Sequence, residues 1–436
     1  MTFFIKTFGC QMNVNDSEKI RQLLENKGLR VCSSEAAADV IVVNSCAVRA
    51  KPQEKIFSYI GQFSPAKKIV VAGCVAQVEK ETIFKKKVKV DYVVGTHQFY
   101  RIGEIIDEIV AGQRAKTATA FSRQWQELVP AAQARSSQVT GYLSIMEGCD
   151  NFCSYCIVPF TRGREKCRPM SAIVREAEYL AAEDFKEIVL LGQNVNHWQD
   201  PKNGQTFPEL LHQLARRVPV PWIRFITSYP GYHDRELVRV MAENRNIARH
   251  IHFPAQSGSS RILKKMQRTY SRSQYVKIIS DFRRAMPEMK FSSDFIVGFP
   301  GETGHDFNLS LSLLEQVQYE SVFSFIYSPR SHTRAATMAA TVPAAQAKER
   351  LLALQKLQAE IQLKNNRQLI GRIVKVLIIE QNRKKPGEVI GRSESYRAVN
   401  FSSQTPIGTF VQVKITGAGP HSLRAEEIIK PPDVQT

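Results

Sequence analysis

Short apolar runs alternate with a helical pattern along the first part of the chain. The runs "FFIKTFGC", "DVIVVNSC" and "KKIVVAGC" are rich in β-branched or aromatic residues and end at Cys10, Cys46 and Cys74. Between the first two, "NDSEKIRQLLENKG" has helical periodicity. It predicts a helix that is capped by Asn15 or Asp16 and stopped by Gly28. Alternating strands and helices predict a doubly wound parallel sheet with helices on both faces.

Residues 112–139 have little periodicity and many small or polar side chains, and are predicted to form a linker. From Gly141 the strand and helix alternation resumes. It gives six candidate strands: "YLSIM", "EIVLLG", "IRFIT", "HIHFPA", "FSSDFIVG" and "VFSFIY". Six such units predict a partial (β/α)6 barrel, with its chemistry at the C-terminal strand ends.

The last part of the chain changes pattern again. Leu351, Leu354, Leu357 and Ile361 recur at helical spacing among charged residues, which predicts an amphipathic helix that packs on the body. Beyond Gly371, short strands with turn signals predict a small antiparallel β-barrel. We therefore expect an α/β protein with domains at residues 1–125, 126–368 and 369–436.

Length and composition agree with this division. The chain has 436 residues, 43% of them hydrophobic and 23% charged, which is enough for about three domains of roughly 150 residues each. No apolar run is long enough to span a bilayer, and the first residues lack the features of a signal peptide. We expect a cytoplasmic protein whose eight cysteines are thiols or metal ligands rather than disulfides.

The chain is strongly basic, with a formal net charge of +19 and an isoelectric point near 9.6. Such a charge favours an anionic partner, and nucleic acid is the commonest large one. A basic surface that only aids solubility explains the charge equally well.

Three cysteines crowd together in "GCDNFCSYC", namely Cys149, Cys153 and Cys156. A structural zinc site needs four ligands, which it usually recruits as two pairs. Three thiolates in a compact loop suit a cubane iron-sulfur cluster with one open iron. A zinc site or a redox-inert loop is the alternative.

Cys10, Cys46 and Cys74 form a second set. If their strands are parallel neighbours, the thiols leave the same edge of the sheet and converge, as ligand-binding groups do in open α/β folds. The alternative is three buried small hydrophobes. Cys32 and Cys167 fit neither set, although Cys167 is close to the triplet in sequence.

The triplet spacing, with Tyr155 directly before the last cysteine, resembles the signature of the radical AdoMet (S-adenosylmethionine) enzymes. Over nearly the whole chain the sequence is similar to the methylthiotransferases of that family. The similarity rests on "TFGCQMNVNDSE", "VVNSCAVR", "VAGCVAQ", "GCDNFCSYCIVPFTRGRE", "LLGQNVN", "FPAQSGSSRILKKMQRTYSRSQY", "SDFIVGFPGET" and "YSPR".

This resemblance implies two [4Fe-4S] clusters and AdoMet as cofactors. Cys10, Cys46 and Cys74 would hold the first cluster, and Cys149, Cys153 and Cys156 the second. The most similar branch acts on carbon 2 of a dimethylallyl-modified adenosine next to the tRNA anticodon. An AdoMet-derived radical would remove the hydrogen, and the target base would leave its stack to be reached.

Polar residues at the strand ends are candidates to bind AdoMet or nucleotide, together with Tyr155 in the cysteine loop and Asp294 within a strand. Their alternative roles are packing, turn capping or a buried hydrogen bond. The candidates are Tyr155, Gln193, Asn194, Gln256, Ser257 and Asp294.

The resemblance also implies that the C-terminal module is a TRAM domain, a β-barrel that grips tRNA. Basic residues there could contact phosphates, or could form a solvated face. They are Arg383, Lys384, Lys385, Arg392 and Arg397.

Two positions depart from the family pattern. The family usually has serine where this chain has Cys167, and a Pro-Gly pair where it has Ser331 and His332. Neither departure touches an expected ligand.

We further expect a monomer that does not bind membranes and that receives electrons from a flavodoxin- or ferredoxin-like donor. The sequence does not identify the sulfur donor. Three other functions stay open. The first is a methylthiotransferase that acts on threonylcarbamoyladenosine in tRNA or on a ribosomal protein. The second is a non-catalytic iron-sulfur protein that binds RNA, and the third is a zinc-stabilised protein that binds RNA.

Overall fold

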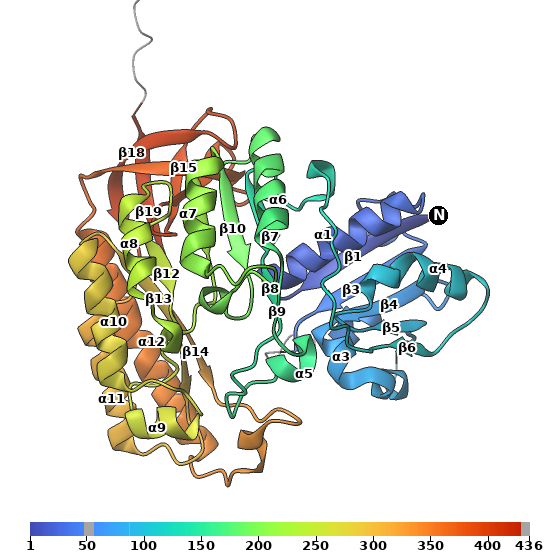
Figure 1. The fold of residues 1–436 in the computed structure, drawn as a ribbon, viewed down its shortest axis with the longest axis horizontal. Coiled ribbons are helices and arrows are strands. Elements are labelled where there is room, and N and C mark those ends of the chain that lie inside the picture. The colour runs from blue at the N-terminus through green and yellow to red at the C-terminus, as the bar shows by residue number, and fades with distance from the viewer. Residues whose placement is uncertain (48–55, 87, 429–436) are drawn as a thin grey trace, which may run out of the picture. The chain divides into compact units, whose positions relative to one another are not determined.

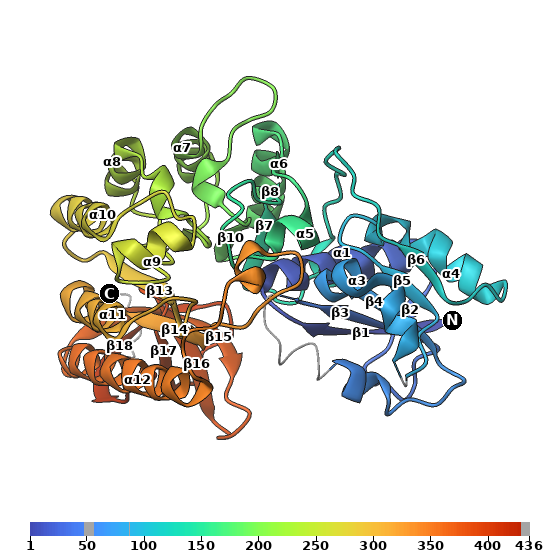
Figure 2. The same cartoon turned by 90° about the horizontal axis from the view of Figure 1, so that it is seen from below.

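The computed structural model describes residues 1–47, 56–86 and 88–428. The chain forms two compact units. Unit 1 comprises Met1–Glu183, Leu190–Thr206 and Ser328–Thr337, and unit 2 comprises Asp184–Val189, Phe207–Tyr327 and Met338–Thr436. Figures 1 and 2 show their elements from two directions.

Unit 1 is built on a six-stranded parallel sheet with the order β2-β1-β3-β4-β5-β6. Its strands are β1 (Thr2–Phe8), β2 (Arg30–Val31), β3 (Val40–Ser45), β4 (Lys68–Gly73), β5 (Tyr92–Val94) and β6 (Lys116–Ala118). Val40 and Val42 pack with helices α1 (Gln11–Asn26) and α4 (Ile102–Val110). Ile41 and Val43 pack on the other face with α3 (Cys74–Glu79), since successive side chains of a strand point to opposite faces. The doubly wound sheet is confirmed.

The predicted cap of the first helix was wrong. Helix α1 begins at Gln11, with Cys10 in the N-cap position, so Asn15 and Asp16 lie inside the helix. Both side chains are 1% exposed and face buried polar partners instead of capping the helix end. The predicted stop is confirmed, since α1 ends two residues before Gly28, which has a φ of +86°.

The predicted linker contains the edge strand β6. Its sequence "KTA" is too short and too polar to give an apolar pattern, and its pairing with β5 defines it as a strand. The linker also contains a short 3-10 helix at Ala132–Ala134.

The remainder of unit 1 carries the cysteine triplet. Strands β8 (Met146–Glu147) and β9 (Lys166–Cys167) pair antiparallel and close a loop between them. Helix α5 (Val158–Arg162) lies in this loop, which β7 (Thr140–Ser144) precedes and α6 (Met170–Ala182) follows.

All six strands predicted after Gly141 are present. The five after β7 are β10 (Glu187–Leu191), β11 (Trp222–Phe225), β12 (His250–His252), β13 (Lys290–Val297) and β14 (Ser321–Ile326). They form two three-stranded sheets with the orders β11-β10-β7 and β12-β13-β14, and β10 runs through the division between the units. The predicted partial barrel is therefore divided, by its hydrogen bonds, into two halves.

Helices separate the strands of unit 2, as α/β alternation requires. They are α7 (Phe207–Arg217), α8 (Arg235–Glu243), α9 (Ser260–Lys265), α10 (Arg272–Ala285), α11 (Gly304–Val317) and α12 (Ala344–Arg367). Helix α12 buries Ala347, Leu354 and Ile361 at heptad spacing, which confirms the predicted amphipathic helix.

The C-terminal strands form a closed barrel in the order β15-β16-β17-β19-β18. They are β15 (Ile373–Gln381), β16 (Glu388–Ser393), β17 (Ala398–Ser402), β18 (Phe410–Ala418) and β19 (Ser422–Glu427). The predicted barrel is confirmed, with one difference: β17 and β19 pair parallel, whereas the other pairs are antiparallel.

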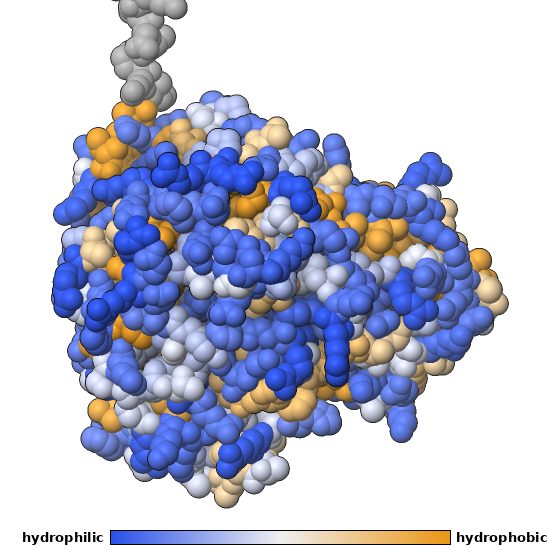
Figure 3. Space-filling view, viewed as in Figure 1, coloured by the Kyte–Doolittle hydropathy of each residue, from blue (hydrophilic) through white to orange (hydrophobic). Residues whose placement is uncertain are grey.

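The face of the protein drawn in Figure 3 is mostly hydrophilic, with apolar residues in small groups. In the described residues, no helix combines the length and the apolar character needed to cross a membrane.

Candidate functional site

Cys10, Cys46 and Cys74 leave three neighbouring strands at one edge of the unit 1 sheet. Phe8 of β1 pairs with Ser45 of β3, and Ser45 pairs with Gly73 of β4. The cysteines follow these paired positions by one or two residues, so the strand register brings them to the same level. Cys10 is exposed, whereas Cys46 and Cys74 are 7% and 4% exposed.

Amide side chains and a glycine fix the backbone around this set. Asn13 Nδ2 donates to Asn44 Oδ1 at 3.2 Å, and Asn44 Nδ2 donates back to Asn13 O at 2.9 Å. Gly73, directly before Cys74, has a φ of +88°, and a Cβ there would lie 2.3 Å from Asn44 Oδ1. Both its conformation and its space therefore require glycine.

The thiols of this set lie in a charged environment. A hydrogen bond with Cys46 and the positive charge of Arg162 lower the pKa of Cys10 to about 6, against the effect of desolvation. Burial raises the pKa of Cys74, and the charge of Arg162 opposes that rise. Arg162 thus acts on two of the three thiols.

The triplet lies in the loop between β8 and β9. Cys149 N donates to Gly163 O at 3.2 Å, and Cys156 N donates to Cys153 O at 2.9 Å. A Cβ on Gly148, which has a φ of +82°, would lie 2.1 Å from Arg164 O. The loop therefore folds back so closely that only glycine fits beside Cys149.

Burial raises the pKa of Cys149 and that of Cys167 to about 11. Cys167 sits on β9 opposite Met146, just outside the loop. Cys32 donates hydrogen bonds to the carbonyls of Phe3 and Ser34. Within residues 1–47, 56–86 and 88–428, no three Cys, His, Asp or Glu side chains converge as one bound metal ion requires.

Segment Ser328–Thr337 packs against the triplet loop, since Ala335 N donates to Ser154 O at 2.7 Å. His332, one of the two departures from the family pattern, has a φ of +67°, and its ring centroid lies 5.7 Å from that of Phe160. The backbone is left-handed at His332, and histidine is among the residues that tolerate this conformation.

The predicted AdoMet residues of unit 1 have different surroundings. Gln193 Oε1 accepts a hydrogen bond from Gly148 N at 2.6 Å and so supports the triplet loop. Asn194 is 1% exposed, and in the described structure neither its Oδ1 nor its Nδ2 has a hydrogen-bond partner. Tyr155 is half-buried in the loop itself.

In unit 2, Gln256 follows β12 with a φ of +68°, and its backbone bonds to Asp294 O and Ile296 N of β13. Ser257 Oγ accepts from Ser259 N at 3.2 Å, so its side chain caps a turn.

Asp294 pairs with His252, with 3.2 Å between Oδ2 and Nε2. Phe323, its register partner on β14, is 51% exposed. The structure therefore gives Asp294 a hydrogen-bonding partner on the neighbouring strand, beside an exposed aromatic ring.

The basic residues of the C-terminal barrel divide into two groups. Arg383, Lys384 and Lys385 are exposed in the turn between β15 and β16. Arg392 instead pairs with buried Glu187, and Arg397 Nη2 lies 2.6 Å from Glu320 Oε2. The ion pairs mark Arg392 and Arg397 as structural cations.

Sequence reasoning missed a buried charged network beside the cysteine sets. Arg162 Nη2 donates to Asp16 Oδ2 at 2.6 Å, with both side chains at most 3% exposed. Glu147 Oε2 lies 3.4 Å from Lys166 Nζ and 3.6 Å from His97 Nε2. The sequence feature that could have indicated this network is the run "NVNDSEK", which places polar residues at helix positions that are usually apolar.

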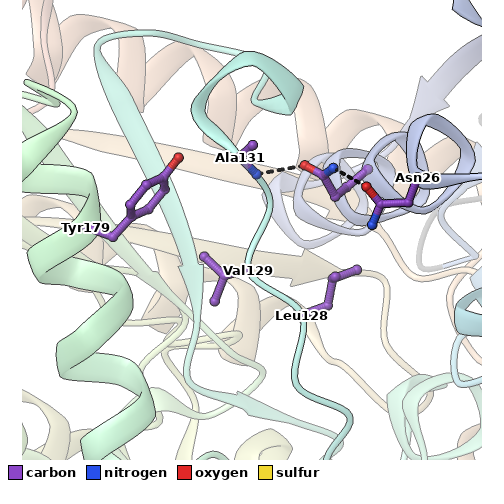
Figure 4. Close-up of a pocket in the computed structure, with 6 residues that line it drawn as sticks. Asn26, Leu128, Val129, Ala131 and Tyr179 are labelled. Carbon is purple, nitrogen blue, oxygen red and sulfur yellow. Dashed lines mark hydrogen bonds between the residues drawn. The ribbon is translucent and has the colours of Figure 1, made fainter.

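Unit 1 also has a surface pocket beside α1 and α6, which is separate from the cysteine residues. Ala131 N donates to Gln22 Oε1 at 2.8 Å across it, and Gln22 donates in turn to Asn26 (Figure 4). The pocket is lined by Gln22, Asn26, Leu128, Val129, Ala131 and Tyr179. These residues include no metal ligand or nucleophile.

Three family models match the chain. They are described as uncharacterized protein family UPF0004 at residues 2–95, Radical SAM superfamily at residues 143–314 and TRAM domain at residues 367–428. Among solved structures, the fold is similar to the radical S-adenosylmethionine methyltransferase TsrM from Kitasatospora setae. The TM-score is 0.56 at 14% identity, over 77% of this chain and 74% of that one. The fold and the cysteine loop thus define a radical SAM protein.

Curated relatives match over nearly the whole chain. A protein of Koribacter versatilis is 39% identical over 98% of each chain, and one of Bacillus subtilis is 38% identical over 98% of this chain and 86% of its own. Both are named tRNA-2-methylthio-N(6)-dimethylallyladenosine synthase. The chain belongs to the family of these synthases, within the radical SAM superfamily.

Proposed function

We propose that the protein attaches a methylthio group to carbon 2 of N6-dimethylallyladenosine next to the anticodon of tRNA. The names and the identity of the relatives support this activity. The observation that carries it is the presence, in one unit, of two three-cysteine sets, each of which leaves one iron of a cubane without a protein ligand.

The residues present fit the cofactors that this function needs. Cys10, Cys46 and Cys74 would hold one [4Fe-4S] cluster at the sheet edge, and Cys149, Cys153 and Cys156 the other in the glycine-hinged loop. Asn194 fits AdoMet, because a buried amide without a partner offers both a donor and an acceptor. When bound, the clusters and AdoMet supply the radical chemistry that an unactivated C–H bond requires.

The other predicted contacts stay proposals of unequal support. Gln193 supports the triplet loop through Gly148 and so orients its cysteines. Gln256 has a left-handed backbone conformation after β12, and Tyr155 lies within the triplet loop. Asp294 and His252 offer a donor and an acceptor next to Phe323, a combination suited to a nucleobase. Ser257 is the weakest candidate, because its hydroxyl is used in a turn.

The first test is nucleoside analysis of the reaction products. Reconstituted protein is incubated anaerobically with AdoMet, a reductant and tRNA that bears dimethylallyladenosine, unmodified adenosine or threonylcarbamoyladenosine. Mass spectrometry is expected to find a methylthio group on the first nucleoside only.

Each other outcome contradicts a defined part of the proposal. A methylthio group on threonylcarbamoyladenosine moves the protein to another substrate. Formation of 5′-deoxyadenosine without any modified nucleoside removes tRNA as the substrate. Iron and sulfide in full amount without AdoMet cleavage leave an iron-sulfur RNA-binding protein, and zinc in place of iron leaves a zinc-stabilised one.

We propose that the turn between β15 and β16 contacts the tRNA backbone through Arg383, Lys384 and Lys385, which are exposed. Arg392 and Arg397 contribute less to RNA binding, because their charges are already paired with Glu187 and Glu320. The match to the TRAM domain supports RNA binding by this barrel.

Replacing Arg383, Lys384 and Lys385 together by alanine is expected to weaken tRNA binding and to flatten its salt dependence. The slope of log K against log salt should fall by about 0.7 to 0.9 for each lost phosphate contact. Binding is measured by fluorescence anisotropy across a salt series, with exposed Lys348 and Lys356 of α12 replaced as a matched control. An unchanged slope in the triple variant would remove this turn from the interface.

The oligomeric state, the location and the electron donor are further parts of the proposal. We propose a monomer in the cytoplasm that receives single electrons from a flavodoxin- or ferredoxin-like protein, because AdoMet cleavage consumes an electron from outside the chain. Size-exclusion chromatography with light scattering tests the first statement, and product formation with each reduced donor tests the last.

A further inference from the structure

Helix α5 connects the two cysteine sets within unit 1. It starts two residues after Cys156, and it packs against α3, which starts at Cys74. Residues that follow β5 bind its far end: Thr96 Oγ1 donates to Thr161 O at 2.6 Å. The N-terminal sheet therefore holds the helix that continues from the triplet.

His97 makes a second bond to this helix end. Because Ser122 N–H donates to His97 Nδ1 at 3.1 Å, the ring proton lies on Nε2, which donates to Arg162 O at 3.0 Å. Burial lowers the pKa of His97, so the ring is held neutral in this bridge. These two hydrogen bonds fix the backbone of Arg162 and therefore the position from which its side chain extends.

The Arg162 side chain reaches the helix that starts beside Cys10. Its Nη2 lies 2.6 Å from Asp16 Oδ2 on α1, with side-chain exposures of 3% and 2%. Among the described residues, Arg162 Nη1 and Asp16 Oδ1 have no hydrogen-bond partner. A buried ion pair with unsatisfied atoms is expensive, so it indicates a group that is bound there in the working protein.

Within the described residues, Arg162 is one of the cations near the N-terminal thiols, and Arg330 is another. Glu147 also faces it, but Lys166 and His97 lie beside that carboxylate. Lys19 of α1 is directed to the ring of Trp125, with 5.6 Å between Nζ and the ring centroid. Arg162 lies at the end of α5, which packs against the helix that starts at Cys74, and it pairs with Asp16 on the helix that starts directly after Cys10.

We propose that Arg162 and Asp16 are positioning residues for the cluster held by Cys10, Cys46 and Cys74. The free Nη1 of Arg162 donates a hydrogen bond to a sulfur of that cluster, and its charge raises the cluster's reduction potential. Asp16 holds the guanidinium in place and offsets part of its charge. Hydrogen bonds to the sulfurs and the local net charge are established determinants of such potentials. This inference depends on the proposed function only in requiring a cluster at these cysteines.

The test is a redox titration of the N-terminal cluster followed by electron paramagnetic resonance. Full-length protein with Cys149, Cys153 and Cys156 replaced by alanine is reconstituted anaerobically, so that the signal comes from one cluster. Arg162→Gln is expected to lower its midpoint potential, because a positive charge is lost. Asp16→Asn is expected to raise it, because the positive charge is no longer offset.

Two further variants control for effects unrelated to charge. Arg162→Lys keeps the charge and should stay close to the parent potential. Arg164→Gln removes an arginine that is 75% exposed and paired with Asp150, and it should leave the potential unchanged. Iron and sulfide content are measured for every variant, so that the potentials are compared at equal cluster occupancy.

Shifts of Arg162→Gln and Asp16→Asn in the same direction, or no shift in either, would overturn the proposal and leave the pair a structural role. If Arg162→Gln fails to hold a cluster, Asp16→Asn is compared with the Asp16→Asn, Arg162→Gln double variant. The double variant is expected to have the lower potential of the two because it lacks the positive charge, and equal potentials in those two contradict the proposal. A parent protein without a cluster at these cysteines overturns both proposals. The titration uses no tRNA, so a wrong substrate leaves its result unaffected.

Discussion

Replacing Cys10 by alanine is expected to abolish methylthiolation while AdoMet cleavage continues, whereas Cys153→Ala abolishes both. Cys10 belongs to the set at the sheet edge, and Cys153 is the buried centre of the triplet loop. Loss of an outer partner of a metal ligand already costs about 10- to 100-fold in activity, so loss of a ligand should cost more than that. Mass spectrometry of nucleosides and of 5′-deoxyadenosine in the same reaction separates the two effects.

The matched controls are Cys32→Ala and Cys167→Ala. Cys32 lies half-buried and donates to backbone carbonyls, and Cys167 lies on β9 outside the loop. Both variants should keep product formation and both clusters. Product formation by Cys10→Ala, or loss of AdoMet cleavage in that variant with the second cluster intact, would contradict the division of roles between the two sets.

Replacing Glu187 by alanine is expected to destabilise unit 2 by about 3 to 5 kcal/mol, the cost of leaving buried cations without their partner. Glu187 is fully buried, and its Oε1 lies 2.5 Å from Arg224 Nε, while its other oxygen pairs with Arg392 of the barrel. Removing this one carboxylate therefore takes the anionic partner away from two guanidinium groups. The loss is measured as a shift of the unit 2 transition in chemical denaturation.

The control for this effect is Glu236→Ala on α8, where the ion pair with Arg239 lies at the surface. It should change stability little, because solvent screens exposed pairs. Glu187→Gln keeps the volume of the side chain and should still be strongly destabilised, since the lost charge and not the lost packing is responsible. A stability of Glu187→Ala equal to that of the parent would show that solvent reaches the two arginines.

The sequence predicted those parts of the protein whose signal is local. Three apolar runs that end at Cys10, Cys46 and Cys74 predicted strands of a parallel sheet, and the structure makes β1, β3 and β4 neighbours in it. Six strand patterns gave the barrel strands, and turn signals gave the C-terminal barrel. These predictions used apolar runs, helical spacing and turn residues, which are local signals that can be read from the sequence alone.

The sequence did not reveal features that depend on distant partners. The ion pair of Arg392 with Glu187 could not be expected, because the two residues are 205 positions apart in the sequence. Asp16 looked like a helix cap because its partner Arg162 is 146 residues away. Such charges pair through the fold, so neither spacing nor composition distinguishes them from solvated ones.

Tyr396, in the turn between β16 and β17, has three neighbours that join the barrel to the rest of unit 2. Arg224 lies 5.1 Å and Arg392 lies 4.7 Å from its ring centroid, and the His250 ring stacks at 5.7 Å. These contacts join the barrel to strands β11 and β12, so the barrel and these two strands are expected to move together as one part of unit 2.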